Sequence, residues 1–273
     1  MSLMMASMRK SLDTAGLCYL HGNGSVKCLW HGPPGATRIA RAMSDEISIA
    51  IETSCREGGV ALGVGDRLAG RIDFDASRRH AAQLIVQLDD LLGRAGLKPG
   101  QLQHVYVSAG PGGFTGLRVG ITVARMLGEL VAGLECAAVP TAWAVAENLH
   151  NRPWERLAVI LDAGEGEAIA TTFTRRDGQP VADEPAGPMP TAALAERLPR
   201  PILLTGEGLW YHDIAGDGIE LADPALRLAT AEGVWRVGRR LAGLGAFTTP
   251  NHLLPIYARP LRVQRPGGDQ QTT

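Results

Sequence analysis

The chain lacks the features that mark membrane-spanning, disulfide-rich and nucleic-acid-coating proteins. None of its apolar runs approaches the ~20 residues that span a bilayer. Its formal net charge of −1 is too small for a protein whose whole surface grips nucleic acid, although a local basic patch stays open. We therefore expect a globular protein of the cytoplasm with no membrane segment. Its four cysteines fit neither a disulfide framework nor a zinc site: Cys18, Cys28, Cys55 and Cys136.

Several signatures of catalysis are also missing. None of the seven histidines belongs to an H-x-x-x-H or H-E-x-x-H pattern, so a zinc or iron site has no support. There is no G-x-S-x-G elbow for a serine nucleophile. We predict neither a metal ligand nor a catalytic residue in this chain.

The two ends differ from the rest of the sequence. Residues 1–44 are basic and poor in acidic residues, which is typical of targeting peptides, but their short apolar stretches show no helical period. We expect a disordered N-terminal extension or an upstream start, with initiation at Met43. Residues 264–273 are expected to form a disordered tail.

Between these ends the pattern indicates an α/β protein with an internal repeat. Apolar residues recur at helical spacing over residues 80–95, which predicts an amphipathic helix that begins at His80. Two segments share three apolar residues, an acidic residue, a second strand and a polar turn; the first contains Glu52 and the second Asp162. We predict two related lobes, residues 45–150 and 151–263, each a mixed sheet flanked by helices and opened by a β-hairpin.

The densest motif is SAGPGGFTGLRVG, residues 108–120, which follows a strand-like run and leads into a helix-like run. Backbone N–H groups in such a turn converge on an anion. The P-loop pattern fails because Leu117 replaces the lysine, and the Rossmann pattern fails because Thr115 replaces the last glycine. A tight structural turn fits equally well. The candidates for a nucleotide or cleft role are Gly110, Pro111, Gly112, Gly113, Thr115 and Gly116.

The two hairpins carry the acidic candidates, with Glu52, Thr53 and Ser54 in the first and Asp162 in the second. In a two-lobed nucleotide enzyme such acids face each other across a cleft, and the hydroxyl groups hydrogen-bond phosphate. An acid that caps its own turn is the alternative. We expect a cleft location without catalysis.

The helix that begins at His80 and the start of the helix after the glycine loop are candidates for a partner surface. The apolar stripe of the first helix either extends to a partner or packs in the core. Arg118 is suited to pair with a phosphate or an acid across an interface. The candidate interface residues are His80, Leu84, Leu88, Leu91, Phe114 and Arg118.

Five segments make the chain resemble the TsaB (YeaZ) family: IETSC…GVAL, the helix from His80, VSAGPGGFTGLRVG, VILDAGEGEAIA and PIYARPLRV. The resemblance spans residues 46–263 and is most specific at the glycine loop, where the family carries a GPGSFTGLR-like signature. It implies an actin/Hsp70-like (ASKHA) fold with duplicated ribonuclease H-like lobes. It also implies a part in forming N6-threonylcarbamoyladenosine at position 37 of tRNAs that read ANN codons.

The sister family, TsaD, shares the opening strand and the loop but adds a metal-binding H-x-x-x-H helix. The corresponding stretch here, VPTAWAVAENL, has no histidine, so the resemblance points to the non-catalytic partner. Glu52 stands for the family's usual Asp and Gly113 for its usual Ser, and PIYARPLR varies its ending. The implied partners are a TsaD-like catalytic subunit and a TsaE-like ATPase, with tRNA reached only through the complex and a homodimer as another arrangement.

Other functions stay open at this point. No cofactor is certain, and ATP or ADP bound weakly or at a subunit interface is compatible with the resemblance. The runner-up is an ATP-binding hydrolase or glycoprotease-like enzyme of the same superfamily, which would use Glu52, Asp162 and the glycine loop. A sugar- or acyl-kinase relative would need an adenine-site glycine pair in the second lobe, where only TGEG is present.

Overall fold

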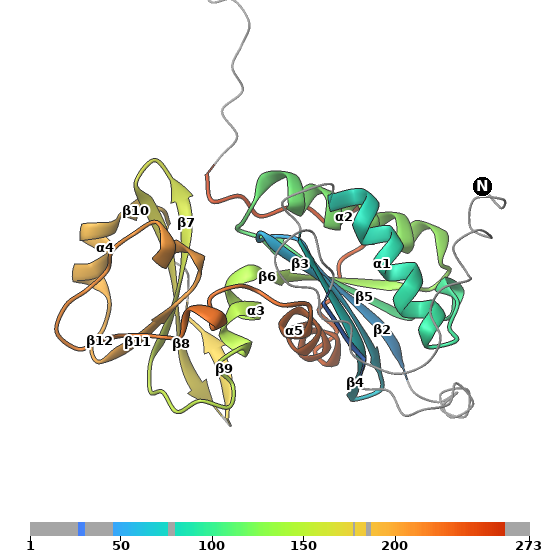
Figure 1. The fold of residues 1–273 in the computed structure, drawn as a ribbon, viewed down its shortest axis with the longest axis horizontal. Coiled ribbons are helices and arrows are strands. Elements are labelled where there is room, and N and C mark those ends of the chain that lie inside the picture. Colours follow the sequence, from blue (N-terminus) through green and yellow to red (C-terminus); the bar gives the residue numbers. More distant parts are fainter. Residues whose placement is uncertain (1–26, 31–45, 76–79, 177, 184–186, 260–273) are drawn as a thin grey trace, which may run out of the picture.

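A computed structural model describes residues 27–30, 46–75, 80–176, 178–183 and 187–259. The expectations for residues 1–26, 31–44 and 264–273 lie outside these residues, as does Met43. The described chain forms two mixed sheets flanked by helices, as the sequence predicts (Figure 1).

The first sheet has six strands in the order β1-β4-β3-β2-β5-β6. Its first four strands pair antiparallel, and β5 and β6 continue parallel to β2. The strands are β1 (Lys27–Trp30), β2 (Ile47–Glu52), β3 (Glu57–Val64), β4 (Arg67–Asp75), β5 (His104–Gly110) and β6 (Glu135–Pro140).

Residues 27–30 were expected to lie outside the fold as part of the N-terminal extension, and this is wrong. They form β1, which pairs with β4 in a register that places Lys27 opposite Asp73 and Trp30 opposite Gly70. Without β1, the strand β4 would form the edge of the sheet, with a row of unpaired backbone groups. The strand pattern of residues 46–75 gives no signal for this addition.

The second sheet repeats the beginning of the first. In both, an antiparallel hairpin (β2–β3 or β7–β8) is followed by a strand parallel to its first member (β5 or β11). This confirms the internal repeat, with Glu52 and Asp162 near the ends of the corresponding strands β2 and β7. The strands are β7 (Leu157–Gly164), β8 (Glu167–Arg176), β9 (Gln179–Ala182), β10 (Met189–Pro190), β11 (Ile202–Thr205) and β12 (Ile219–Leu221).

The helices separate the sheets into layers. Helices α1 (His80–Arg94) and α2 (Phe114–Leu130) cover the outer face of the first sheet, whereas α3 (Thr141–Glu147) and α5 (Ala231–Gly243) lie between the two sheets (Figure 1). Helix α4 (Thr191–Arg197) covers the outer face of the second sheet. Short 3₁₀ turns complete the described elements: η2 (Pro99–Gln101), η3 (Glu207–Trp210), η4 (Pro224–Leu226) and η5 (Pro250–His252).

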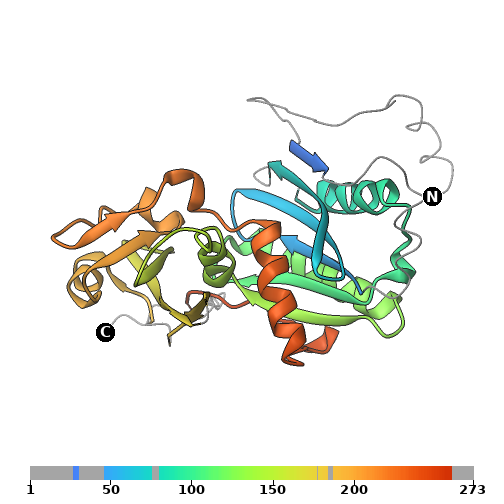
Figure 2. The ribbon, with the colours of Figure 1, turned by 90° about the horizontal axis from the view of Figure 1, so that it is seen from below.

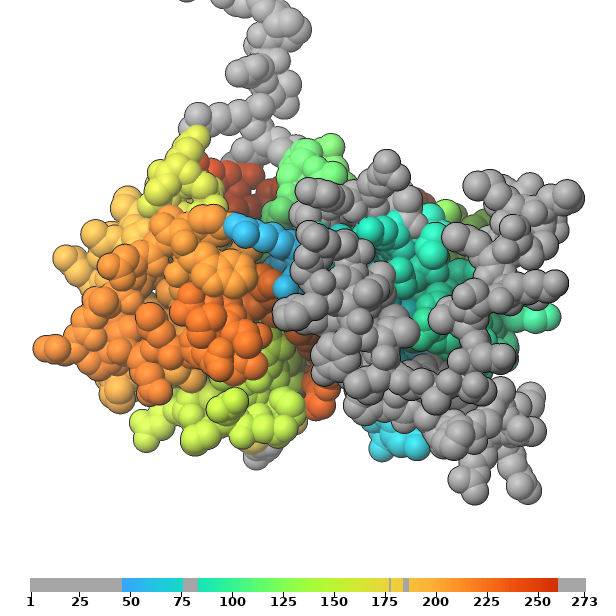
Figure 3. All heavy atoms as spheres, viewed as in Figure 1, coloured from blue at the N-terminus to red at the C-terminus, as the bar shows by residue number. Residues whose placement is uncertain are grey.

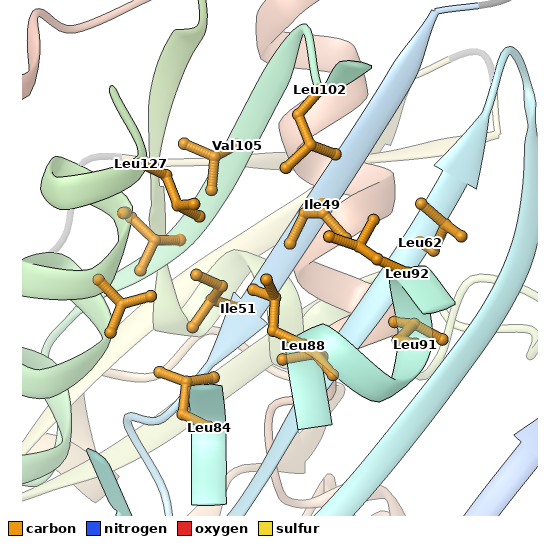
Figure 4. Close-up of a cluster of buried hydrophobic side chains, with 14 of the residues drawn as sticks. Ile49, Ile51, Leu62, Leu84, Leu88, Leu91, Leu92, Leu102, Val105 and Leu127 are labelled. Atoms are coloured by element: carbon orange, nitrogen blue, oxygen red, sulfur yellow. The ribbon is translucent and has the colours of Figure 1, made fainter. Parts of the chain in front are cut away.

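Alternation along the strands explains these layers. Ile49 and Ile51 of β2 pack in the core beneath α1 and α2, while Ala50 faces the core beneath α3 and α5. Figure 4 shows the leucines of α1 gathered over Ile49, Ile51 and Leu62. Both faces of β2 are therefore buried, which suits its continuous apolar run.

The last part of the chain returns to the first sheet, so residues 151–263 are not one separate lobe. Helix α5 packs on β2, β3 and β5 (Figure 2), and Trp235 donates its indole N–H to Ser48 Oγ at 3.1 Å. The packing of α5 on β5 requires a glycine at position 238, because a Cβ there would lie 2.2 Å from the ring of Tyr106. Farther on, the Ile256 N–H donates to the Ala109 carbonyl at 2.6 Å.

Candidate functional site

The glycine motif forms the predicted strand–loop–helix connection. Strand β5 ends at Gly110, the Gly110–Pro111 peptide is cis, and α2 begins at Phe114. Gly110 has a φ of +112°, a conformation that L side chains rarely adopt. The loop therefore has the backbone geometry that the glycines suggest.

The loop is packed against the chain's own backbone. A Cβ on Gly112 would lie 2.6 Å from the Ser54 carbonyl oxygen, and one on Gly110 would lie 2.2 Å from the Ile256 carbonyl oxygen. The Gly113 N–H donates to the Ser54 carbonyl at 2.7 Å. The loop's close contacts are thus with peptide groups of the chain itself, and they require glycine at both positions.

Thr53 and Ser54 are buried beside this loop and bond within the chain. The Thr53 hydroxyl donates to the Gly116 carbonyl at 2.8 Å, and the Ser54 hydroxyl donates to Glu52 Oε1 at 2.6 Å. The Ser54 N–H donates to the same carboxyl oxygen. Glu52 therefore caps its own turn, which is the alternative that the sequence left open.

Glu52 is fully buried, and burial raises its pKa to about 7 even though hydrogen bonds from Ser54 oppose the shift. Its second oxygen, Oε2, has no hydrogen-bond partner among the described residues. Cys55 beside it is buried too, and burial followed by the charges of Glu52 and Glu207 raises the pKa of its thiol. A thiol in this setting is a buried packing group rather than a nucleophile.

Asp162 lies in the second lobe and bonds away from the glycine loop. Its Oδ1 is 2.9 Å from His212 Nε2, and the other ring nitrogen, Nδ1, is 3.1 Å from the Thr191 hydroxyl. Burial and the charge of Asp162 raise the pKa of Glu207, and Arg56 opposes this shift. Glu207 is therefore the acid of the second lobe that interacts electrostatically with both Asp162 and Arg56.

Arg56 of the first hairpin contacts the second lobe. It donates to the Tyr211 hydroxyl, and its guanidinium lies 5.7 Å from the Trp210 ring centroid and 5.8 Å from that of Tyr211. In Figure 3 the blue atoms of this hairpin lie against orange atoms of the second lobe. The sequence did not predict a role for Arg56, Glu207, Tyr211 or His212. The only motif noted near the last three was TGEG, and no motif marked Arg56.

The expected partner residues of α1 divide into two groups. Leu84, Leu88 and Leu91 are at most 6 % exposed and belong to the core of the first sheet, so the expectation that they form a partner surface is corrected. His80 begins α1, as predicted. Among the side chains of this helix that the structure describes, the exposed large apolar ones are Ile85 and Val86, at 48 % and 61 %.

The start of α2 carries the other two expected partner residues at the surface. Phe114 is 43 % exposed, and its ring stacks on Tyr257 with centroids 5.2 Å apart. Arg118 is exposed as well, with its guanidinium 4.0 Å from the Phe114 ring centroid and its Nε–H donating to the Tyr257 hydroxyl at 3.1 Å. Phe114, Arg118, Thr122 and Met126 form an exposed stripe with a spacing of four residues.

The described part of the chain offers neither a metal-binding cluster nor a membrane-spanning helix. No group of three or more His, Cys, Asp or Glu side chains there could hold a metal ion. None of the helices there is long and apolar enough to cross a membrane.

Comparison with known proteins gives one consistent group of relatives. A family model described as "TsaD: tRNA N6-adenosine threonylcarbamoyltransferase" matches residues 72–188. The protein called "tRNA threonylcarbamoyladenosine biosynthesis protein TsaB" in Escherichia coli (strain K12) is 24 % identical over 221 residues, which cover 77 % of this chain and 94 % of that protein. Its namesake in Bacillus subtilis (strain 168) is 26 % identical over 168 residues, covering 60 % and 72 %.

A solved structure supports the fold. YeaZ from Pseudomonas aeruginosa superposes with a TM-score of 0.68 at 24 % identity, over 78 % of this chain and 99 % of that chain. The shared architecture confirms the predicted α/β fold with two mixed sheets flanked by helices.

Proposed function

The chain belongs to the TsaB/YeaZ family, and from this premise we propose that it is a non-catalytic subunit of the machinery that forms N6-threonylcarbamoyladenosine in tRNA. In this proposal it acts in the cytoplasm by binding a TsaD-type threonylcarbamoyltransferase. A TsaE-type ATPase joins the two proteins, and tRNA is contacted only through the complex.

The observation that carries this proposal is the exposed apolar surface of two neighbouring helices. Ile85 and Val86 of α1 and Phe114 and Met126 of α2 are each more than 40 % exposed, although both helices belong to a well-packed core. Helices α1 and α2 contact each other, and large apolar side chains left exposed on neighbouring helices are typical of a protein-binding surface.

Co-purification tests the proposal. The tagged chain is expected to retain the TsaD-type protein of the same organism, and Val86→Asp is expected to weaken that complex at least about tenfold, because a charge would be buried in an apolar contact. Leu221→Asp is the matched control, since Leu221 is 49 % exposed on β12 of the second lobe. The control should leave binding unchanged.

Two results would contradict the proposal. One is the absence of any complex with the unaltered chain. The other is ATP turnover by the purified chain alone that disappears in Asp162→Ala, which would favour the hydrolase alternative. Equal binding by Val86→Asp and the unaltered chain would place the partner on a different face.

A further inference from the structure

The cluster of Arg118, Phe114 and Tyr257 is assembled from two distant parts of the chain. Leu253 is fully buried in the core of the first sheet, and the Ile256 N–H bonds to β5, so the C-terminal segment is fixed on both sides of Pro255. This places the Tyr257 ring on Phe114 and its hydroxyl 3.1 Å from Arg118 Nε. The guanidinium is therefore held by the Phe114 ring and the Tyr257 hydroxyl before any partner binds.

The Arg118 guanidinium has no acidic partner among the described residues. Among the described residues no carboxylate lies within ion-pair distance of Arg118, whereas other arginines such as Arg94, Arg236 and Arg259 have carboxylate partners. Arg118 donates to Tyr257 through Nε, and neither of its terminal nitrogens bonds to another described residue. A planar fork of N–H donors matches the two oxygens of a carboxylate.

From these observations, and resting on the proposed function, we propose that Arg118 is a pre-positioned receptor for a carboxylate side chain of the TsaD-type partner. Holding the guanidinium against the Phe114 ring and the Tyr257 hydroxyl removes rotamer freedom in advance, so less entropy is lost when the pair forms. Leu254 and Ile256, which precede Tyr257 in the chain and are 60 % and 46 % exposed, add apolar surface to this segment that a partner would cover.

The surroundings favour a protein carboxylate over an RNA phosphate. Aromatic and aliphatic side chains beside an arginine are typical of the centre of a protein interface. A phosphate backbone is bound by a broad positive field, but this chain has a net charge of −1. An acidic residue at the edge of an apolar partner patch matches both the charge and the neighbours of Arg118.

Binding affinities of Arg118 variants for the purified TsaD-type protein test this inference. Arg118→Ala is expected to raise Kd about tenfold or more. Arg118→Lys should restore little of this loss, because it keeps the charge without the fork. Tyr257→Phe removes only the bracing hydroxyl and should raise Kd a few-fold. Arg197→Ala, an exposed arginine of α4, is the control and should bind as the unaltered chain does.

The outcomes separate the two proposals. If the unaltered chain binds no TsaD-type protein, the proposed function fails. If it binds and Arg118→Ala binds equally well, or if Arg118→Lys restores full affinity, the carboxylate receptor is wrong while the proposed function stands. Loss of self-association instead of partner binding would assign Arg118 to a second copy of this chain. Binding that requires added tRNA would assign it to phosphate.

Discussion

At the scale of single residues, burial decides what the acidic candidates do. Glu52 lies at the end of β2 with one oxygen bonded to Ser54 and the other without a partner among the described residues. Burial of this carboxyl favours its neutral form, because a charged carboxylate would lose its hydration. This setting suits a structural cap rather than an ionised ligand for a cation.

We expect Glu52→Gln to stabilise the protein at alkaline pH. The pKa of Glu52 is raised from 4.5 to about 7 in the folded state, so its stabilising contribution is complete below pH 4.5 and is lost as the pH rises toward 7. Glutamine keeps an oxygen for Ser54 and does not ionise. We compare the free energy of unfolding of the variant with that of the unaltered chain at each pH. Between pH 4.5 and pH 8, this difference should shift by roughly 3 kcal/mol in favour of the variant.

Urea denaturation between pH 4.5 and 8 measures this effect. Glu57→Gln, at an exposed position on the same hairpin, is the control and should follow the unaltered chain at every pH. Parallel stability curves for Glu52→Gln and the unaltered chain would show that Glu52 ionises as readily when folded as when unfolded.

At the scale of elements, local patterns were predictable and distant contacts were not. The apolar spacing of residues 80–95 predicted α1 to within one residue, because amphipathic periodicity is a property of the helix itself. The same spacing does not distinguish a Leu84 that contacts a partner from one that packs on its own sheet, because both surroundings are apolar. The contact of Ile256 with Gly110 joins segments that share no local signal.

Two helical glycines are expected to respond to alanine with opposite signs. A Cβ on Gly238 of α5 would lie 2.2 Å from the ring of buried Tyr106, whereas one on Gly93 of α1 would meet nothing within 4 Å. Alanine favours both helices, so packing decides the difference. Gly238→Ala should lower the free energy of unfolding by about 2 kcal/mol or more, and Gly93→Ala should raise it by about 0.5–1 kcal/mol.

Thermal and urea unfolding of the two variants check these values. A stabilised Gly238→Ala protein would mean that α5 does not lie against Tyr106 as described. A destabilised Gly93→Ala protein would mean that this position of α1 is covered.

At the scale of the whole molecule, the C-terminal segment around Ile256 and Arg259 contacts both lobes. Arg259 donates to the Gly164 carbonyl at 2.9 Å and to Glu167 Oε2 at 2.6 Å, and it also pairs with Glu165. These contacts attach the segment that closes the glycine loop to the β7–β8 turn of the second lobe. The amphipathic patterns gave no indication of this link, because its partners are more than ninety positions apart.

Arg259→Ala is expected to loosen this link without unfolding the protein. Partly exposed ion pairs contribute little, so the free energy of unfolding should change only slightly. Hydrogen exchange should become faster at the β7–β8 turn and at Ile256, and it should stay unchanged in α4. Unchanged exchange at both of the first two sites would show that Arg259 does not hold the segment in place.

The return of α5 to the first sheet has a consequence for how the protein is made. The inner face of that sheet, with Ala50 and Tyr106, is covered by α5, which leaves the ribosome after the whole second lobe. The second sheet is contiguous in sequence and can form while the first still lacks this layer. During synthesis the nascent chain therefore exposes an apolar face for as long as residues 141–230 are being added, which makes it a client for chaperones at that stage.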